Sequence, residues 1–367
     1  MDRQKQINYC TFCPKLCRFV CPVALQSRRE TDTPAGKYAL LYLQKKGTLN
    51  FDAELASVMY QCTQCNAGRW VCDHQINNEE GIWEARRDAV VKGVEPANAR
   101  SAKDFFLVFG SHQGTNLLGR LRGEIPEFFF GRQASIVYMP SCSTIVDRPQ
   151  NIRDTVKILS VLYGSAFTVY DSPQQCCGYI LHTLGYEEEF VENAKVVSKE
   201  LSKYKQIIIG DPACVYTLRH IYPSYGLGIH AQIFHTSEFF HQHIDELVSH
   251  VGKIPEGPAA FYHDPCYLGR YLGIYDEPRV LLKTFGGGVV KEFNRRLEHT
   301  ECCGGGGGYP LISPKLASKI AKTRLIQTKE HSHAYVVSAC PTCEHMFSTA
   351  CPEVEVKDLV NVIAENI

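Results

Sequence analysis

An internal repeat constrains the fold of this 367-residue chain more than any other feature. Three pairs of segments match: 134-ASIVYMPSC-142 with 259-AAFYHDPC-266, 174-QQCCG-178 with 300-TECCG-304, and 206-QIIIGDPACVYT-217 with 334-AYVVSACPTC-343. Cys176 and Cys302 are 126 residues apart, as are Cys214 and Cys340, so the copies keep the same register. Each copy alternates strands with helical stretches such as 192–205 and 314–330, which predicts two α/β units with mainly parallel sheets.

Every matched segment contains cysteine, and the whole chain has 17 cysteines. In parallel sheets the carboxyl ends of the strands meet at one edge, where α/β folds place ligands. The polar N-terminus has no apolar segment typical of a secretory signal, so a disulfide framework is not expected. Clustered cysteines in a reducing compartment bind metal or perform redox chemistry, and we expect a cytoplasmic protein, held at a membrane only through partners.

The charge and hydropathy patterns exclude two classes of partner. The formal net charge is zero and no basic stretch stands out, which argues against nucleic-acid binding. No apolar run is long enough to cross a membrane, and stretches such as 104-DFFLVFG-110 have the length of core strands. We therefore expect no nucleic acid and no intrinsic membrane segment.

The N-terminal cysteines follow the spacing of iron–sulfur ligands. The run 10-CTFCPKLCRFVCP-22 differs by one residue from the two-cluster ferredoxin run C-x2-C-x2-C-x3-C-P, whose fourth cysteine serves the other cluster. A second run, 62-CTQCNAGRWVCDH-74, has Gly68 where a third cysteine would fall. On this pattern a complete [4Fe–4S] cluster is held by four residues, Cys10, Cys13, Cys17 and Cys72. Helical stretches 34–47, 52–62 and 79–93 surround these runs.

The second ferredoxin-type site has only three thiolates, Cys21, Cys62 and Cys65. It is either a [3Fe–4S] cluster or a [4Fe–4S] cluster completed by Asp73, His74, solvent or another residue. A zinc site with four cysteine ligands is the alternative for these C-x2-C pairs, and seven cysteines in two copies of a ferredoxin run weigh against it.

The two repeats differ in their cysteines. The second has five, Cys266, Cys302, Cys303, Cys340 and Cys343, followed after Cys303 by glycines that let backbone approach a bulky cofactor. A glycine linker would not begin directly after paired cysteines inside a repeated unit. The first repeat has Cys142, Cys176, Cys177 and Cys214, with Thr217 at the fifth position, so its site is empty or holds zinc or a reactive dithiol. Cys351 fits neither pattern.

The combination 262-YHDPCYLGRYLGIYDEPR-279, 301-ECCGGGGG-308 and 338-SACPTCEHMF-347 resembles the cysteine-rich CCG domain of heterodisulfide reductase catalytic subunits. A ferredoxin domain followed by two such domains is similar to the D-type subunit and to iron–sulfur subunits of glycolate oxidase, anaerobic glycerol-3-phosphate dehydrogenase and class II benzoyl-CoA reductase. The fold implied is multidomain α+β and α/β: a small helical two-cluster ferredoxin domain (1–105), a connecting arm (106–133), a degenerate CCG domain (134–250) and a complete one (251–367).

The resemblance also implies a cofactor and a role. The complete five-cysteine motif, Cys266, Cys302, Cys303, Cys340 and Cys343, would bind a noncubane [4Fe–4S] cluster. The implied function is an electron-transfer subunit of a multi-subunit oxidoreductase, with a flavoprotein as the typical partner. The alternatives are a disulfide or heterodisulfide reductase acting at the noncubane cluster, and a zinc-stabilised interaction protein without redox function. His263 and Asp264 are the candidate proton donors, or they orient Cys266.

Overall fold

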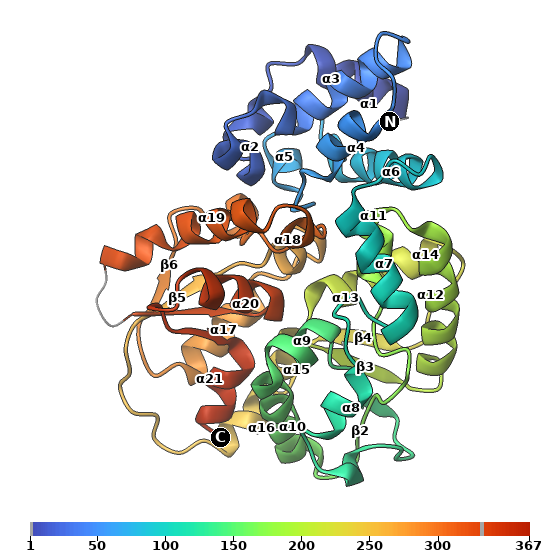
Figure 1. Cartoon of the computed structure of the whole chain (residues 1–367). Coiled ribbons are helices and arrows are strands. Elements are labelled where there is room, and N and C mark those ends of the chain that lie inside the picture. The colour runs from blue at the N-terminus through green and yellow to red at the C-terminus, as the bar shows by residue number, and fades with distance from the viewer. Residues whose placement is uncertain (1–2, 331–333) are drawn as a thin grey trace.

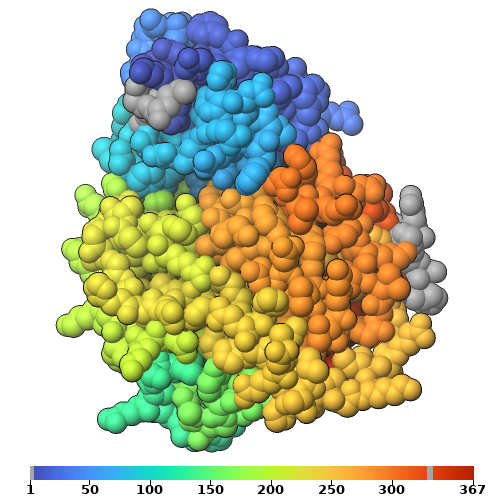
Figure 2. Space-filling view, turned by 180° about the vertical axis from the view of Figure 1, so that it is seen from behind, coloured from blue at the N-terminus to red at the C-terminus, as the bar shows by residue number. Residues whose placement is uncertain are grey.

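The computed structural model describes residues 3–330 and 334–367. Its N-terminal part is helical and lies across one end of two α/β halves, which sit side by side (Figure 1). Figure 2 shows from behind that this N-terminal part lies over one end of the seam between the halves and meets both of them. No helix in the described ranges is both long and apolar enough to span a bilayer.

Each half contains a four-stranded sheet in which every paired strand is parallel. The first sheet has the order β2-β1-β3-β4, with β1 Ile136–Tyr138, β2 Thr168–Val169, β3 Gln206–Ile209 and β4 Gln232–His235. The second has the order β6-β5-β7-β8, with β5 Ala260–His263, β6 Val290–Glu292, β7 Tyr335–Ser338 and β8 Val356–Asp358. The matching orders confirm the α/β prediction for both repeats.

Helices cover both faces of these sheets, which explains why the central strands are continuous apolar runs. The first half contains α9 Cys142–Asp147, α10 Pro149–Tyr163, α11 Tyr179–Leu184, α12 Glu187–Leu201, α13 Pro212–Tyr216, α14 Tyr222–Ser224, α15 Thr236–Gln242 and α16 Ile244–Ser249. The second contains α17 Asp276–Phe285, α18 Tyr309–Ile312, α19 Pro314–Arg324, α20 Pro341–Ala350 and α21 Leu359–Glu365. One buried apolar cluster includes Val137 and Ile207 of the first sheet with Val337 of the second, so the halves share a core.

The described α-helices of the N-terminal part are α1 Arg3–Phe12, α2 Pro22–Ser27, α3 Pro34–Lys45, α4 Ala53–Tyr60, α5 Ala67–Trp70 and α6 Asn78–Val91. The next helix, α7 Ala97–Phe109, lies beside the first half (Figure 1) and joins its buried core through Phe106. Side-chain caps fix two of the starts. Thr33 accepts a hydrogen bond from the Gly36 N–H (2.9 Å), and Asp52 accepts one from the Leu55 N–H (3.0 Å). These helices confirm the predicted helical stretches and hold the cysteine-bearing loops between them.

Two sequence expectations need correction. Residues 104–110 are not a core strand: they form the end of α7, which stops at Gly110 in the left-handed region (φ 69°). The arm after α7 contains α8 Leu117–Arg122 and a 3-10 turn, Glu127–Phe129. Each repeat also has a fourth strand, β4 or β8, that the matched segments did not predict.

Candidate iron–sulfur sites

The structure brings the N-terminal cysteines together in the two groups that the ferredoxin spacing predicts. The first group, Cys10, Cys13, Cys17 and Cys72, lines a small cavity of ≈ 50 Å³. Asp73 and His74 line the same cavity, so they lie with the first group; completing the three-cysteine group was one of several alternatives for them. Ligation by these residues stays a prediction.

A buried lysine lies beside two cysteines of the second group, which consists of Cys21, Cys62 and Cys65. Lys37 is 1% exposed and interacts electrostatically with Cys21 and Cys62, while its Nζ donates a hydrogen bond to the Asp32 carbonyl. Burial of an ammonium group is unfavourable unless a negative charge lies nearby. Burial lowers the pKa of Lys37, and negative charge on Cys21 and Cys62 opposes that shift, so Lys37 is placed to stabilise thiolates at these two positions.

Burial alone would keep these thiols protonated. It raises the pKa of Cys17 to about 11 and that of Cys21 to about 12, because a thiolate loses its hydration in the interior. Bound iron would supply the positive charge that stabilises the thiolates, since metal binding deprotonates coordinating cysteines. The donor set thus fits a metal cluster better than it fits free cysteines.

The third group contains the five motif cysteines of the second half, Cys266, Cys302, Cys303, Cys340 and Cys343, and all five are buried. They follow the carboxyl ends of β5, β6 and β7, which places them at one edge of the parallel sheet. The Cys303 and Cys343 sulfurs are 3.2 Å apart. Main-chain N–H groups of Gly304 and Gly305 donate to the sulfurs of Cys302 (3.3 Å) and Cys303 (3.4 Å), contacts that stabilise a cluster-bound thiolate.

The glycine run after Cys303 packs directly on the second cysteine group. A Cβ on Gly306 would lie 2.5 Å from the Thr63 carbonyl oxygen, and one on Gly307 would lie 2.6 Å from that of Cys62. Gly307 also has φ 65°, a left-handed conformation that disfavours other residues. The run is therefore the wall between two cysteine groups, as a cofactor site requires, and not a flexible linker.

The side chains of Cys65 and Cys302 also meet at this wall, in hydrogen-bonding contact. Arg270, which is 7% exposed, holds both sides together: its Nε donates to the Cys65 carbonyl (2.7 Å) and its Nη1 to the Thr300 carbonyl (2.8 Å). The second and third cysteine groups are thus contiguous.

Arg86 on α6 connects the three parts of the molecule, and nothing in its local sequence predicts that role. Its side chain is 0% exposed, and its guanidinium donates to five main-chain carbonyls: Met59, Tyr60, Cys62, Thr183 and Gly307. The bonds to Cys62, Thr183 and Gly307 are each 2.8 Å long. These carbonyls come from the N-terminal part, the first half and the glycine run, respectively.

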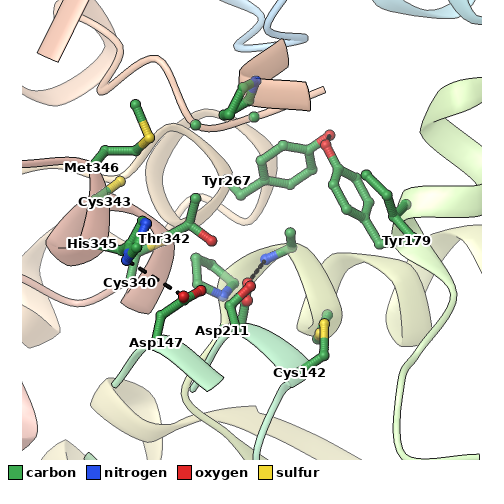
Figure 3. A pocket seen from close by; sticks show the side chains of 18 of the residues that line it. Cys142, Asp147, Tyr179, Asp211, Tyr267, Cys340, Thr342, Cys343, His345 and Met346 are labelled. Atoms are coloured by element: carbon green, nitrogen blue, oxygen red, sulfur yellow. Dashed lines mark hydrogen bonds and ion pairs between the residues drawn. The ribbon is translucent and has the colours of Figure 1, made fainter. Parts of the chain in front are cut away.

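A cavity of ≈ 320 Å³ lies between the two halves (Figure 3). Four cysteines of the first half and four of the second line it: Cys142, Cys176, Cys177 and Cys214, and Cys266, Cys303, Cys340 and Cys343. Asp147 and His345 form an ion pair across it (3.5 Å), and Tyr179 and Tyr267 meet through their hydroxyls (2.8 Å). The repeat predicted each cysteine set but not that the two sets face one cavity.

His263 and Asp264, the candidate proton donors, do not line this cavity. Asp264 is 2% exposed and forms a bidentate ion pair with Arg279 (2.7 and 2.9 Å). The Nδ1 atom of His263 accepts a hydrogen bond from Arg324 (3.2 Å), and burial holds the pKa of His263 well below its usual value. These contacts favour the positioning role over proton transfer.

In residues 3–330 and 334–367, no group of three or more His, Cys, Asp or Glu side chains has the arrangement that holds one metal ion. The cysteines of the third group are buried, and main-chain N–H groups donate to two of their sulfurs, contacts that suit cluster-bound thiolates.

Comparison with known proteins agrees with this arrangement. The model of the 4Fe-4S dicluster domain family matches residues 6–76, and that of the CCG cysteine-rich domain family matches residues 136–219 and 260–348. A probable membrane-anchored ferredoxin of Chromohalobacter salexigens is 28% identical over 87% of this chain and 49% of its own length. The D-type subunit of the dihydromethanophenazine:CoB--CoM heterodisulfide reductase of Methanosarcina barkeri is 27% identical over 85% of this chain and 78% of its own.

A third relative, EtfAB:quinone oxidoreductase of Syntrophomonas wolfei, is 27% identical over 86% of this chain and 46% of its own length. The chain thus spans about half the length of two of these relatives and about three quarters of the third. The matches cover both the helical N-terminal part and the two α/β halves. The chain therefore belongs to the family of iron–sulfur proteins that join a 4Fe-4S dicluster domain to two CCG cysteine-rich domains, to which the D-type heterodisulfide reductase subunits are similar.

Proposed function

We propose that the chain is the electron-transfer subunit of a multi-subunit oxidoreductase. It would relay electrons between a partner flavoprotein and a noncubane [4Fe–4S] centre held by Cys266, Cys302, Cys303, Cys340 and Cys343. When bound, the clusters supply one-electron carriers. The proposal includes a cytoplasmic location, with any membrane contact made through partner subunits.

The observation that carries the proposal is the shared wall between the second and third cysteine groups. Cys65 touches Cys302, and Gly306 and Gly307 leave no space between their own backbone and that of the cysteine loop at 62–65. Arg86 and Arg270 fix this wall with hydrogen bonds to carbonyls on both sides. Such rigid contact sets the spacing of the carriers, which is what a relay protein must do.

Iron and sulfide quantification with EPR on anaerobic protein tests the proposal. We expect a cubane, a second ferredoxin-type cluster and an unusual third centre. Cys303→Ala is expected to remove the third centre only, because Cys303 lies in the second half. Cys351→Ala is the matched control, since Cys351 is buried (3% exposed) but belongs to none of the groups. Loss of the cubane signals in a folded Cys303 variant would contradict the ligand assignment.

The cavity between the halves favours a second candidate, reduction of a small disulfide at the noncubane centre. Thiols of both halves line its wall, and its volume of ≈ 320 Å³ admits a small molecule. Turnover of a disulfide by the isolated chain with reduced viologen would favour catalysis over relay. A third alternative, a zinc-stabilised interaction protein, predicts that the purified chain shows no brown visible absorption and that elemental analysis finds zinc instead of iron.

A further inference from the structure

The four cysteines of the first half form two close pairs. The Cys177 and Cys214 sulfurs are 3.0 Å apart, and the Cys142 and Cys176 sulfurs are 3.6 Å apart. A disulfide bond is about 2.05 Å long, so the closer pair needs a movement of only about 1 Å to bond. All four residues are buried and line the cavity that faces the second half.

The missing fifth cysteine explains why Cys177 pairs with Cys214. In the second half, the equivalent Cys303 has its sulfur 3.2 Å from Cys343. The first half has Thr217 at the matching position, and its hydroxyl donates to the Ala213 carbonyl (2.7 Å) inside the helix. Thr217 therefore offers Cys177 no sulfur. Its sulfur neighbours are Cys214, at 3.0 Å, and the adjacent Cys176, which its side chain also contacts.

The backbone around the pair is held in place. Gly178 has φ 78°, and a Cβ there would lie 2.9 Å from the Asn193 Nδ2 atom, so only glycine fits. Asn193 donates to the Cys176 carbonyl (3.0 Å), and Tyr222 donates to the Cys177 carbonyl (2.9 Å). Such fixed sulfur positions favour reversible bond formation between the two thiols, since little chain entropy is lost when the bond closes.

We infer that Cys177 and Cys214 form a redox-active dithiol, a metal-free two-electron store that faces the third cysteine group across the cavity. Oxidation forms the Sγ–Sγ bond, passes two electrons one at a time to the iron–sulfur centre of the second half, and releases two protons into the cavity. Reduction breaks that bond and takes up two electrons and two protons, giving two thiols. The reductant is the iron–sulfur centre of the third cysteine group, which delivers its electrons one at a time. Only this choice of redox partner rests on the proposed function. The protons arrive through the cavity, which His112 and Asp211 also line.

Thiol mapping of the full anaerobic chain tests the inference. Protein is poised at a series of potentials in a dithiothreitol redox buffer, quenched in acid, alkylated in denaturant and mapped by mass spectrometry. Denaturation releases clusters, so their cysteines are alkylated at every potential. We expect a Cys177–Cys214 disulfide at high potential and two alkylated thiols at low potential. The thiol-to-disulfide ratio should change tenfold per about 30 mV, as a two-electron couple requires.

Variants and metal content complete the test. Cys214→Ser should leave Cys177 alkylated throughout, whereas Cys351→Ser should keep the disulfide. Iron per chain should be the same in the Cys214 variant as in the unaltered chain. The inference is overturned if Cys177 stays alkylated at high potential or if the disulfide joins other cysteines. It is also overturned if Cys214→Ser releases iron or zinc. Absence of iron from the unaltered chain would instead contradict the proposed function, so the two failures are distinguishable.

Discussion

Replacing Arg86 with methionine tests whether a buried guanidinium holds the three parts of the molecule together. The change removes hydrogen bonds to carbonyls of Cys62, Thr183 and Gly307, each 2.8 Å long. Hydrogen bonds from a charged donor contribute about 1.5–3 kcal/mol each, so the three contribute about 4–9 kcal/mol. Burial of the guanidinium opposes this by several kcal/mol, because all five of its acceptors are carbonyls rather than carboxylates.

The free energy contributed by the hydrogen bonds exceeds the cost of burying the guanidinium. We therefore expect Arg86→Met to lower the free energy of unfolding by about 2–4 kcal/mol in iron-free protein. The loss should be larger in iron-loaded protein, since a negatively charged cluster beside Cys62 offsets the burial cost of the cation. Denaturant unfolding followed by circular dichroism under anaerobic conditions measures both values.

Arg87→Met is the matched control on the same helix. Arg87 is 35% exposed and pairs with a 33% exposed Glu187 at 3.5 Å, an interaction typically worth less than about 1 kcal/mol. If the Arg86 and Arg87 variants lose equal stability, or if iron loading makes no difference to the Arg86 variant, the argument for a central cation is refuted.

Two further changes have defined outcomes. Gly307→Ala should destabilise the protein by more than Gly47→Ala, because its Cβ meets the Cys62 carbonyl at 2.6 Å while nothing lies within 4 Å of Gly47; thermal unfolding of both variants, which share a left-handed φ, checks this. Burial lowers the pKa of His235 to about 3, so the unfolded chain binds more protons between pH 3 and 6.5. The His235 contribution to stability should therefore fall as pH falls through this range, by about 2 kcal/mol at pH 5. His182 and His263 contribute in the same direction; if His235→Gln does not reduce the loss of stability by about this amount in denaturant titrations, the assignment is wrong.

The sequence predicted those strands and helices that a short stretch of residues specifies by itself, without contacts to distant parts of the chain. The apolar runs that became β1, β3, β5 and β7 are strands buried by helices on both faces, and each leads into a ligand-type cysteine. The sequence did not predict the fourth strand of the second sheet, β8 (Val356–Asp358), because this strand is short and largely half-buried at a sheet edge. The apolar stretch 104–110 resembles a core strand in the sequence but forms the end of α7 for a different reason. Leu107 (61% exposed) and Val108 (74% exposed) face outward, so hydrophobicity there does not report core packing.

The site was only partly predictable for a similar reason. Cysteine spacing predicted the grouping of the N-terminal thiols, because short loops restrict which sulfurs can meet. The positions of Lys37 and Arg86 depend on tertiary contacts between segments far apart in the chain: the partners of Arg86 range from Met59 to Gly307. The shared cavity likewise depends on how the halves pack, which neither copy of the repeat encodes alone.

The glycine wall has a consequence for how the protein matures. Gly306 and Gly307 touch the backbone of Thr63 and Cys62 with no side chain between them, so the closed seam leaves no entry path there for iron and sulfide. Iron and sulfide for the centre in the second half would therefore enter from the cavity between the halves, which Cys266, Cys303, Cys340 and Cys343 line. We expect a chain already folded without iron to accept this cluster with the seam closed, and EPR-monitored reconstitution would show it.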